Sequence, residues 1–208
     1  MKPTFFERLG SYIIDIIIVS IILSLVCYKL PNNNELDNKE ITTLTEKYIN
    51  KEIDSQTYIK ENSKLIYNSQ KSSTITLIVN VAITIGYFVV FQYLNNGQTI
   101  GKKLFKLRVV NQTDEKPINI LKGFLRSLFT LSIFSNGLNI LFIYLLNENN
   151  YFTIYSIVSG LESIFILITM FLIIYKKDGR GLHDIMTNTK VIKEGAWDYA
   201  WIYRSRNS

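Results

Sequence analysis

The chain has 208 residues, enough for one domain, and 48% of them are hydrophobic. These residues gather in long blocks instead of recurring at helical or strand spacing, which argues against an ordinary water-soluble domain. The formal net charge is +6, but no basic patch interleaved with aromatic residues accompanies it, so we expect no nucleic-acid partner. The expected partner of such a chain is a lipid bilayer.

Four blocks are long enough to cross a membrane. A bilayer core about 30 Å thick needs about 20 mostly apolar residues in a helix that rises about 1.5 Å per residue. The expected spans are residues 9–30, 74–94, 125–146 and 153–175. No small-x-small cleavage site follows the first block, so we expect it to be a retained helix and not a signal peptide.

The third block is the least regular of the four. Its apolar run is interrupted by small and amide residues, namely Ser132, Ser135, Asn136, Gly137 and Asn139. A re-entrant or interfacial helix is therefore the alternative to a full span in this block.

A polar segment, residues 31–73, separates the first two spans. Its apolar residues recur at spacings near three, four and seven: Ile41, Leu44 and Tyr48, then Tyr58, Ile59, Leu65 and Ile66. This periodicity predicts two short amphipathic helices that cap the outer face of the bundle. A receptor-like role of the cap is the alternative to a solvated helical hairpin.

Two short β-prone stretches follow the second and the fourth spans. The alternating KLFKLRVV contains residues 107–110, and TKVI occupies residues 189–192. We expect the two stretches to pair and to tie the second and fourth spans together. Before the third span, Lys122 and Arg126 are four residues apart and are predicted to share a helix face against anionic headgroups. Near the end of the chain, Trp197 and Trp201 suit an interfacial anchor.

The positive charges predict the orientation of the chain. Segments 1–8, 95–124 and 176–208 hold fifteen lysines and arginines. The segment 31–73 holds six, and seven acidic residues offset them. Because lysine and arginine collect on the cytoplasmic side, both termini are expected in the cytoplasm.

Two acidic residues lie inside predicted spans. Asp15 and Glu162 would each cost a few kcal/mol if ionised and exposed to lipid, so both are expected to face the interior of the bundle. With the amides of Asn80 and Asn136 they suggest a path for protons or ions. The alternative for the amides is that they only hydrogen-bond helices together. Arg8 precedes Asp15 by seven residues, about 10 Å along a helix, so the two cannot pair directly.

The only histidine, His183, precedes Asp184 in a glycine-bearing loop after the fourth span. One histidine and one aspartate provide too few ligands for a metal site, so we expect no metal. No nucleophile motif accompanies them, so we also expect no cofactor and no enzymatic activity. An ion-pair cluster is the favoured interpretation. Its expected members are Asp178, Arg180, His183 and Asp184, joined by Arg8 and Arg108.

Three motifs resemble those of the RDD family, which is named for one arginine and two aspartates. ERLGSYIID resembles the first motif with Arg8 and Asp15, and GRGLHDIMTNTKVI resembles the C-terminal motif with Asp184 and His183. GQTIGKKLFKLRVVN is similar to the family signature GxTxGKxxxxLRVV. The signature residues here are Gly97, Gly101 and Arg108. The chain departs from the family pattern in its long outer segment and at Met186-Thr187-Asn188.

The resemblance implies a multi-pass protein of the bacterial inner membrane, and for some members sodium–proton antiport is reported. We expect a single all-α membrane domain over residues 1–208: a four-helix transmembrane bundle, a helical extracytoplasmic insertion and a small cytoplasmic β-strand pair. Two functions remain open. In a monovalent cation/proton exchanger, Asp15 and Glu162 would alternate between a proton and a cation such as sodium, and so short a chain would need to form a homo-oligomer. In an accessory or protective protein without catalytic activity, the Arg/Asp network would be structural.

Overall fold

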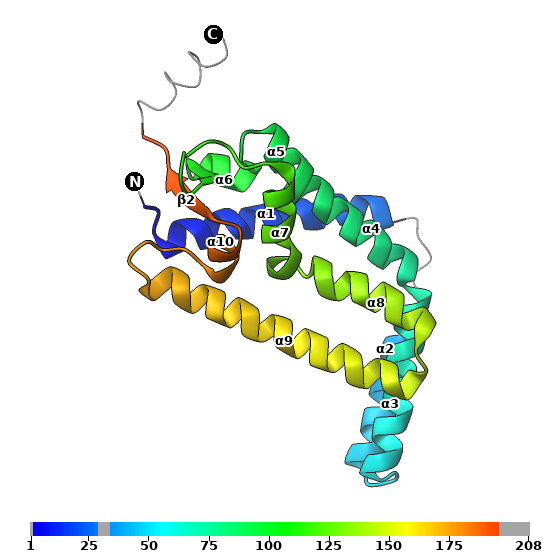
Figure 1. Cartoon of the computed structure of the whole chain (residues 1–208). Coiled ribbons are helices and arrows are strands. Elements are labelled where there is room, and N and C mark those ends of the chain that lie inside the picture. Colours follow the sequence, from blue (N-terminus) through cyan, green and yellow to red (C-terminus); the bar gives the residue numbers. More distant parts are fainter. Residues whose placement is uncertain (1, 29–33, 196–208) are drawn as a thin grey trace.

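The structure is a computed structural model that describes residues 2–28 and 34–195. It is mostly helical with one two-stranded sheet, as the sequence predicts. The predicted anchor residues Trp197 and Trp201 lie outside the described residues. Figure 1 shows the helices stacked side by side, with a helical hairpin projecting at one end and the sheet at the other.

In the described part of the chain, three helices are long and apolar enough to span a membrane, and they confirm three of the predicted spans. The first, α1 (Phe5–Cys27), begins at a capping box in which Thr4 and Glu7 satisfy each other's backbone N–H groups. The second runs without interruption through α4 (Thr74–Ile85), η1 (Gly86–Phe91) and α5 (Gln92–Leu94). The third is α9 (Glu148–Tyr175). Many of their large apolar side chains are exposed, as expected of helices that face lipid.

The remaining block does not form the single helix expected over residues 125–146. It forms α7 (Ile120–Thr130) and α8 (Ile133–Leu145), whose axes meet at 72°. The break falls at Ser132, whose φ of 54° is left-handed and cannot continue a right-handed helix. Only the two helices together are long enough to count as a fourth span.

The polar insertion forms two helices, as its periodicity predicts. They are α2 (Asn34–Ile49) and α3 (Ser55–Ser72), and the rings of Tyr48 and Tyr58 stack between them with centroids 4.7 Å apart. Near the bundle, the Tyr67 hydroxyl donates a hydrogen bond to the backbone oxygen of Ile143 at 2.9 Å, which attaches α3 to α8. The hairpin points away from the end of the bundle that carries the sheet (Figure 1).

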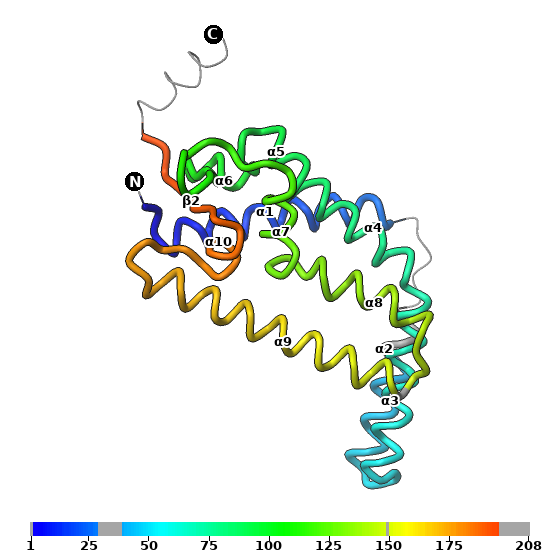
Figure 2. Tube along the Cα trace, in the orientation of Figure 1, coloured from blue at the N-terminus to red at the C-terminus, as the bar shows by residue number. Residues whose placement is uncertain are grey.

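The strand pair also forms as predicted. Strands β1 (Leu107–Asn111) and β2 (Thr189–Lys193) are antiparallel, with Val109 opposite Val191. Because an isolated strand pair is marginally stable, its apolar face needs support, and Ile118 and Phe105 pack against it. The short helices α6 (Ile100–Leu104) and α10 (Leu182–Met186) flank the pair. We call this region, with α7 and the start of α1, the motif end (Figure 2).

Candidate functional site

Asp15 lies two turns inside α1, and its side chain is fully buried. One carboxylate oxygen accepts hydrogen bonds from the Tyr87 hydroxyl at 2.7 Å and from the Gly101 backbone N–H at 2.8 Å. The other oxygen accepts from the Thr99 hydroxyl at 2.5 Å. Tyr87 belongs to the π-helical segment η1, where an altered helical turn re-aims side chains. The carboxylate therefore holds the second span and the loop after it against the first.

The two glycines of the GQTIGK motif are required by close backbone contacts. A Cβ atom on Gly101 would lie 2.1 Å from the backbone oxygen of Ser11, so only glycine lets α6 approach α1 this closely. Gly97 has a φ of +87°, and a Cβ atom there would lie 2.3 Å from the backbone oxygen of Val109. Both glycines therefore set the geometry in which Asp15 meets its partners.

Lys102 brings a positive charge to the same carboxylate. Its ammonium lies 3.9 Å from the Asp15 oxygen and donates hydrogen bonds to Gln92 at 3.1 Å and to Thr99 at 3.2 Å. Burial lowers the pKa of Lys102 to about 8, although the charge of Asp15 opposes that shift. The lysine is therefore still mostly charged at neutral pH.

Asp184, on α10, is the centre of a second buried cluster. One of its oxygens accepts from the Arg126 guanidinium and, at 3.2 Å, from the Thr189 hydroxyl. The other accepts from Arg8 at 3.4 Å and from the Gly181 backbone N–H at 3.3 Å. Burial alone would raise the pKa of Asp184, but the adjacent guanidinium groups outweigh burial and lower it below its usual range. The carboxylate is therefore ionised and joins α1, α7, α10 and β2.

Arg126 corrects one prediction from the sequence. We expected it to face headgroups beside Lys122, yet it is only 8% exposed and pairs with Asp184. Lys122 instead donates to the side-chain oxygen of Asn111 at 2.7 Å, at the end of β1. The physical reason is that a buried carboxylate needs its charge paired and its oxygens hydrogen-bonded, and Arg8 contacts only one oxygen of Asp184.

Of the other expected members of the ion-pair cluster, His183 joins Asp184, and the rest form separate pairs. His183 lies with its Nε2 atom 3.4 Å from Asp184, and burial lowers the pKa of its imidazole to about 4, so the ring is neutral at pH 7. Arg108 does not join them, because it pairs with Glu194 just after β2, and Gln98 also donates to this glutamate at 3.3 Å. Asp178 and Arg180 pair with each other at 2.8 Å on the surface.

The residues of the expected ion path do not form one continuous site. Glu162 is 8% exposed, and one of its oxygens accepts from the Ser135 hydroxyl at 2.6 Å. Its other oxygen has no hydrogen-bond partner in the described part of the chain. Asn80 accepts from Thr84 at 3.2 Å, and Asn136 is half-buried on α8. Within residues 2–28 and 34–195, no hydrogen bond joins these amides or Glu162 to Asp15, and no group of three or more acidic, histidine or cysteine side chains could hold a metal ion.

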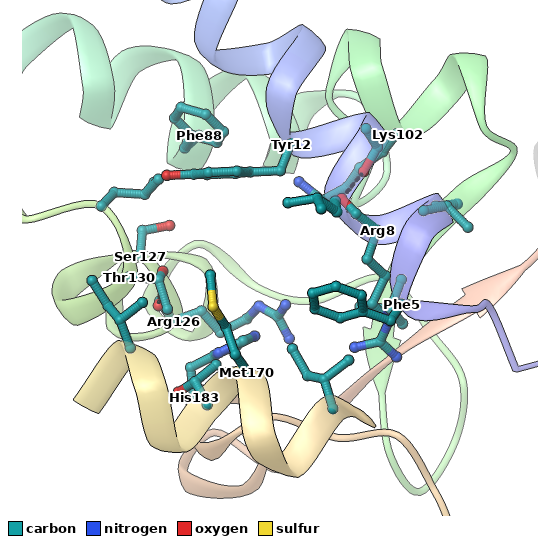
Figure 3. Close-up of a pocket in the computed structure, with 18 of the residues that line it drawn as sticks. Phe5, Arg8, Tyr12, Phe88, Lys102, Arg126, Ser127, Thr130, Met170 and His183 are labelled. Carbon is teal, nitrogen blue, oxygen red and sulfur yellow. Dashed lines mark hydrogen bonds between the residues drawn. The ribbon is translucent and has the colours of Figure 1, made fainter. Parts of the chain in front are cut away.

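A cavity of about 240 Å³ lies between α1, α7, α9 and the loops of the motif end (Figure 3). Arg8, Lys102 and Arg126 all line it, together with the neutral His183. Figure 3 shows Tyr12 and Phe88 on one side of this space and Met170 on the other. The cavity lining therefore combines three cationic side chains with mostly apolar ones.

The sequence model described as the RDD family matches residues 2–188. The chain belongs to the RDD family. Comparison with curated proteins and with solved structures gave no match. In this RDD protein, the arginine and the two aspartates occupy two separate buried clusters. Arg8 binds Asp184 across 176 positions of sequence, and Asp15 binds the loop before β1.

Proposed function

We propose that this RDD multi-pass membrane protein is an accessory protein without catalytic activity, and that Arg8, Asp15 and Asp184 form a latch that closes the motif end. The observation that supports this is the saturation of the two carboxylates. Each oxygen of Asp15 and of Asp184 already accepts at least one hydrogen bond from a group fixed in the fold. A carboxylate that exchanged protons for cations would have to release such partners in every cycle, at about 1–3 kcal/mol for each buried donor left unpaired.

A cation/proton exchange assay tests whether Arg8, Asp15 and Asp184 form a structural latch or a transport site. Purified protein is reconstituted into vesicles with a pH-sensitive dye inside, and the vesicles are challenged with sodium, lithium and potassium. We expect no cation-dependent proton flux. The substitutions Asp15→Asn and Asp184→Asn should reduce the yield of folded protein, and Asp114→Asn, on the exposed turn after β1, should not. A flux that Asp15→Asn abolishes without loss of folded protein would contradict the proposal.

A monovalent cation/proton exchanger is the second candidate function, and Glu162 favours it. Its carboxylate is buried within a spanning helix, and one of its oxygens has no hydrogen-bond partner among the described residues, as a transported proton or cation would require. The same vesicles containing Glu162→Gln test this candidate. A flux in the wild-type protein that disappears in folded Glu162→Gln would establish exchange through Glu162 and would overturn the accessory function, although Arg8, Asp15 and Asp184 could still form a structural latch.

A further inference from the structure

The cavity at the motif end contains more positive charge than its carboxylates balance. Three cations, Arg8, Lys102 and Arg126, face two carboxylates, Asp15 and Asp184. The remaining excess is one positive charge in a largely buried place. Such an excess favours an anionic ligand, because the attraction between charges is stronger where water is excluded.

Arg8 also has hydrogen-bond donors that nothing in the fold accepts. Only its Nη1 atom contacts Asp184, whereas its Nε and Nη2 atoms are buried and have no partner among the described residues. A buried donor left unpaired costs about 1–3 kcal/mol, and native proteins rarely leave two on one side chain. A guanidinium with two free N–H directions matches two oxygens of a phosphate or a carboxylate.

The rest of the cavity lining is mostly apolar, and some of these side chains reach the surface of the spanning helices. Leu9, Phe88 and Ile166 belong to this lining, together with Tyr12 from α1 and Met170 from α9. Tyr12 is 41% exposed and Met170 is 39% exposed, and both belong to helices that can span the membrane. The lining of the cavity therefore includes side chains on helix surfaces along which acyl chains would pack.

We propose that this cavity binds the phosphate group of an anionic phospholipid, with the acyl chains outside it along α1 and α9. Arg8, Lys102 and Arg126 supply the positive charge around the phosphate, and the buried Arg8 side chain turns so that its unpaired N–H groups reach the phosphate oxygens. Sites for drug-sized ligands measure about 300–1,000 Å³, so a cavity of about 240 Å³ fits a headgroup and excludes a whole lipid. Free phosphate would make the same polar contacts, but it would leave the apolar lining residues without a ligand. The inference does not depend on whether the protein transports ions.

Binding is measured by native mass spectrometry of the delipidated full chain, titrated with phosphatidylglycerol, phosphatidylcholine or inorganic phosphate. Thr130 lines the cavity beside the latch without belonging to it, so Thr130→Glu adds a negative charge there. Thr130→Gln is the matched control, because glutamine has the same size as glutamate but carries no charge. We expect at least about tenfold tighter binding of phosphatidylglycerol than of phosphatidylcholine, because about 1.4 kcal/mol of charge attraction suffices for that factor. Thr130→Glu should remove this preference, and Thr130→Gln should keep it.

The possible contrary results identify which part of the inference fails. Equal binding of the two lipids, or a preference that Thr130→Glu leaves intact, would overturn the assignment to this cavity. Inorganic phosphate that binds as tightly as phosphatidylglycerol would overturn the assignment to a lipid. Arg8→Gln is unsuitable as the decisive variant, because loss of the Asp184 contact can prevent folding.

Discussion

Gly101 is the residue at which the first spanning helix and the loop after the second come into backbone contact. We predict that Gly101→Ala destabilises the protein by about 3 kcal/mol or more, because its Cβ would meet the Ser11 oxygen at 2.1 Å and break the hydrogen bond to Asp15. Gly160→Ala is the control, since a Cβ there meets nothing within 4 Å. The measurement is the fraction of monodisperse protein that survives heating in detergent. Equal melting temperatures of the Gly101→Ala and Gly160→Ala variants would contradict the close contact between Gly101 and Ser11.

His183 predicts a specific pH dependence of stability. Burial lowers the pKa of its imidazole from 6.5 to about 4, so the unfolded chain binds a proton at a higher pH than the folded one. Stability should therefore fall as the pH drops from about 6.5 to about 4, by up to roughly 3 kcal/mol from this residue. The check is the difference in melting temperature between wild type and His183→Gln at pH 7 and at pH 4.5. Identical pH profiles would show that the imidazole titrates normally.

At the scale of elements, a largely buried ion pair joins Arg108 of β1 to Glu194, just after β2. Reversing one charge, by Arg108→Glu or Glu194→Arg, should cost about 3 kcal/mol or more because a buried charge then lacks its counterion. The double reversal should recover at least half of that loss. The pair Lys190 and Glu115 is the control, because it is exposed and its reversal should change stability by less than about 1 kcal/mol.

Measurement of the double-mutant cycle uses the same heating assay. A double variant no more stable than the worse single variant would show that the two charges do not interact in the folded protein. Loss of stability on reversing Lys190 and Glu115 would show that the assay responds to surface charge in general.

The elements that could be predicted are those whose signal is local. Long apolar runs are sufficient to indicate α1, the helix from Thr74 to Leu94 and α9, because the membrane thickness sets their length. Alternation and position after a span similarly indicate β1 and β2. The bend between α7 and α8 could not be assigned to one residue, because several residues interrupt this block and serine carries no strong preference for the left-handed φ that Ser132 adopts.

The contents of the site were harder to predict than its location. Motif resemblance pointed to Arg8, Asp15 and Asp184, but it did not indicate Arg126, because a basic residue on an amphipathic helix looks the same whether it faces lipid or protein. One signal was present: Gly123, Arg126 and Ser127 share a helix face, and small residues on a face indicate close packing. Glu194 follows the matched motifs, so nothing in them paired it with Arg108.

At the scale of the whole molecule, the helical hairpin and the motif end lie at opposite ends (Figure 1). We predict that they lie on opposite sides of a bacterial inner membrane, with the positively charged motif end in the cytoplasm. In a Cys27→Ser background, Glu52→Cys in the hairpin turn should react with an impermeant maleimide from outside the cell. Asp114→Cys, in the turn after β1, should react only after permeabilisation. Both positions are exposed, so labelling of both from one side would contradict this topology.

The contact between Arg8 and Asp184 joins the first and the last parts of the chain that the structure describes. During translation, Arg8 is synthesised long before Asp184, the aspartate that binds it. The contact between α1 and α10 can therefore form only after Asp184 has been synthesised. A nascent chain that stops before Asp184 therefore lacks the latch.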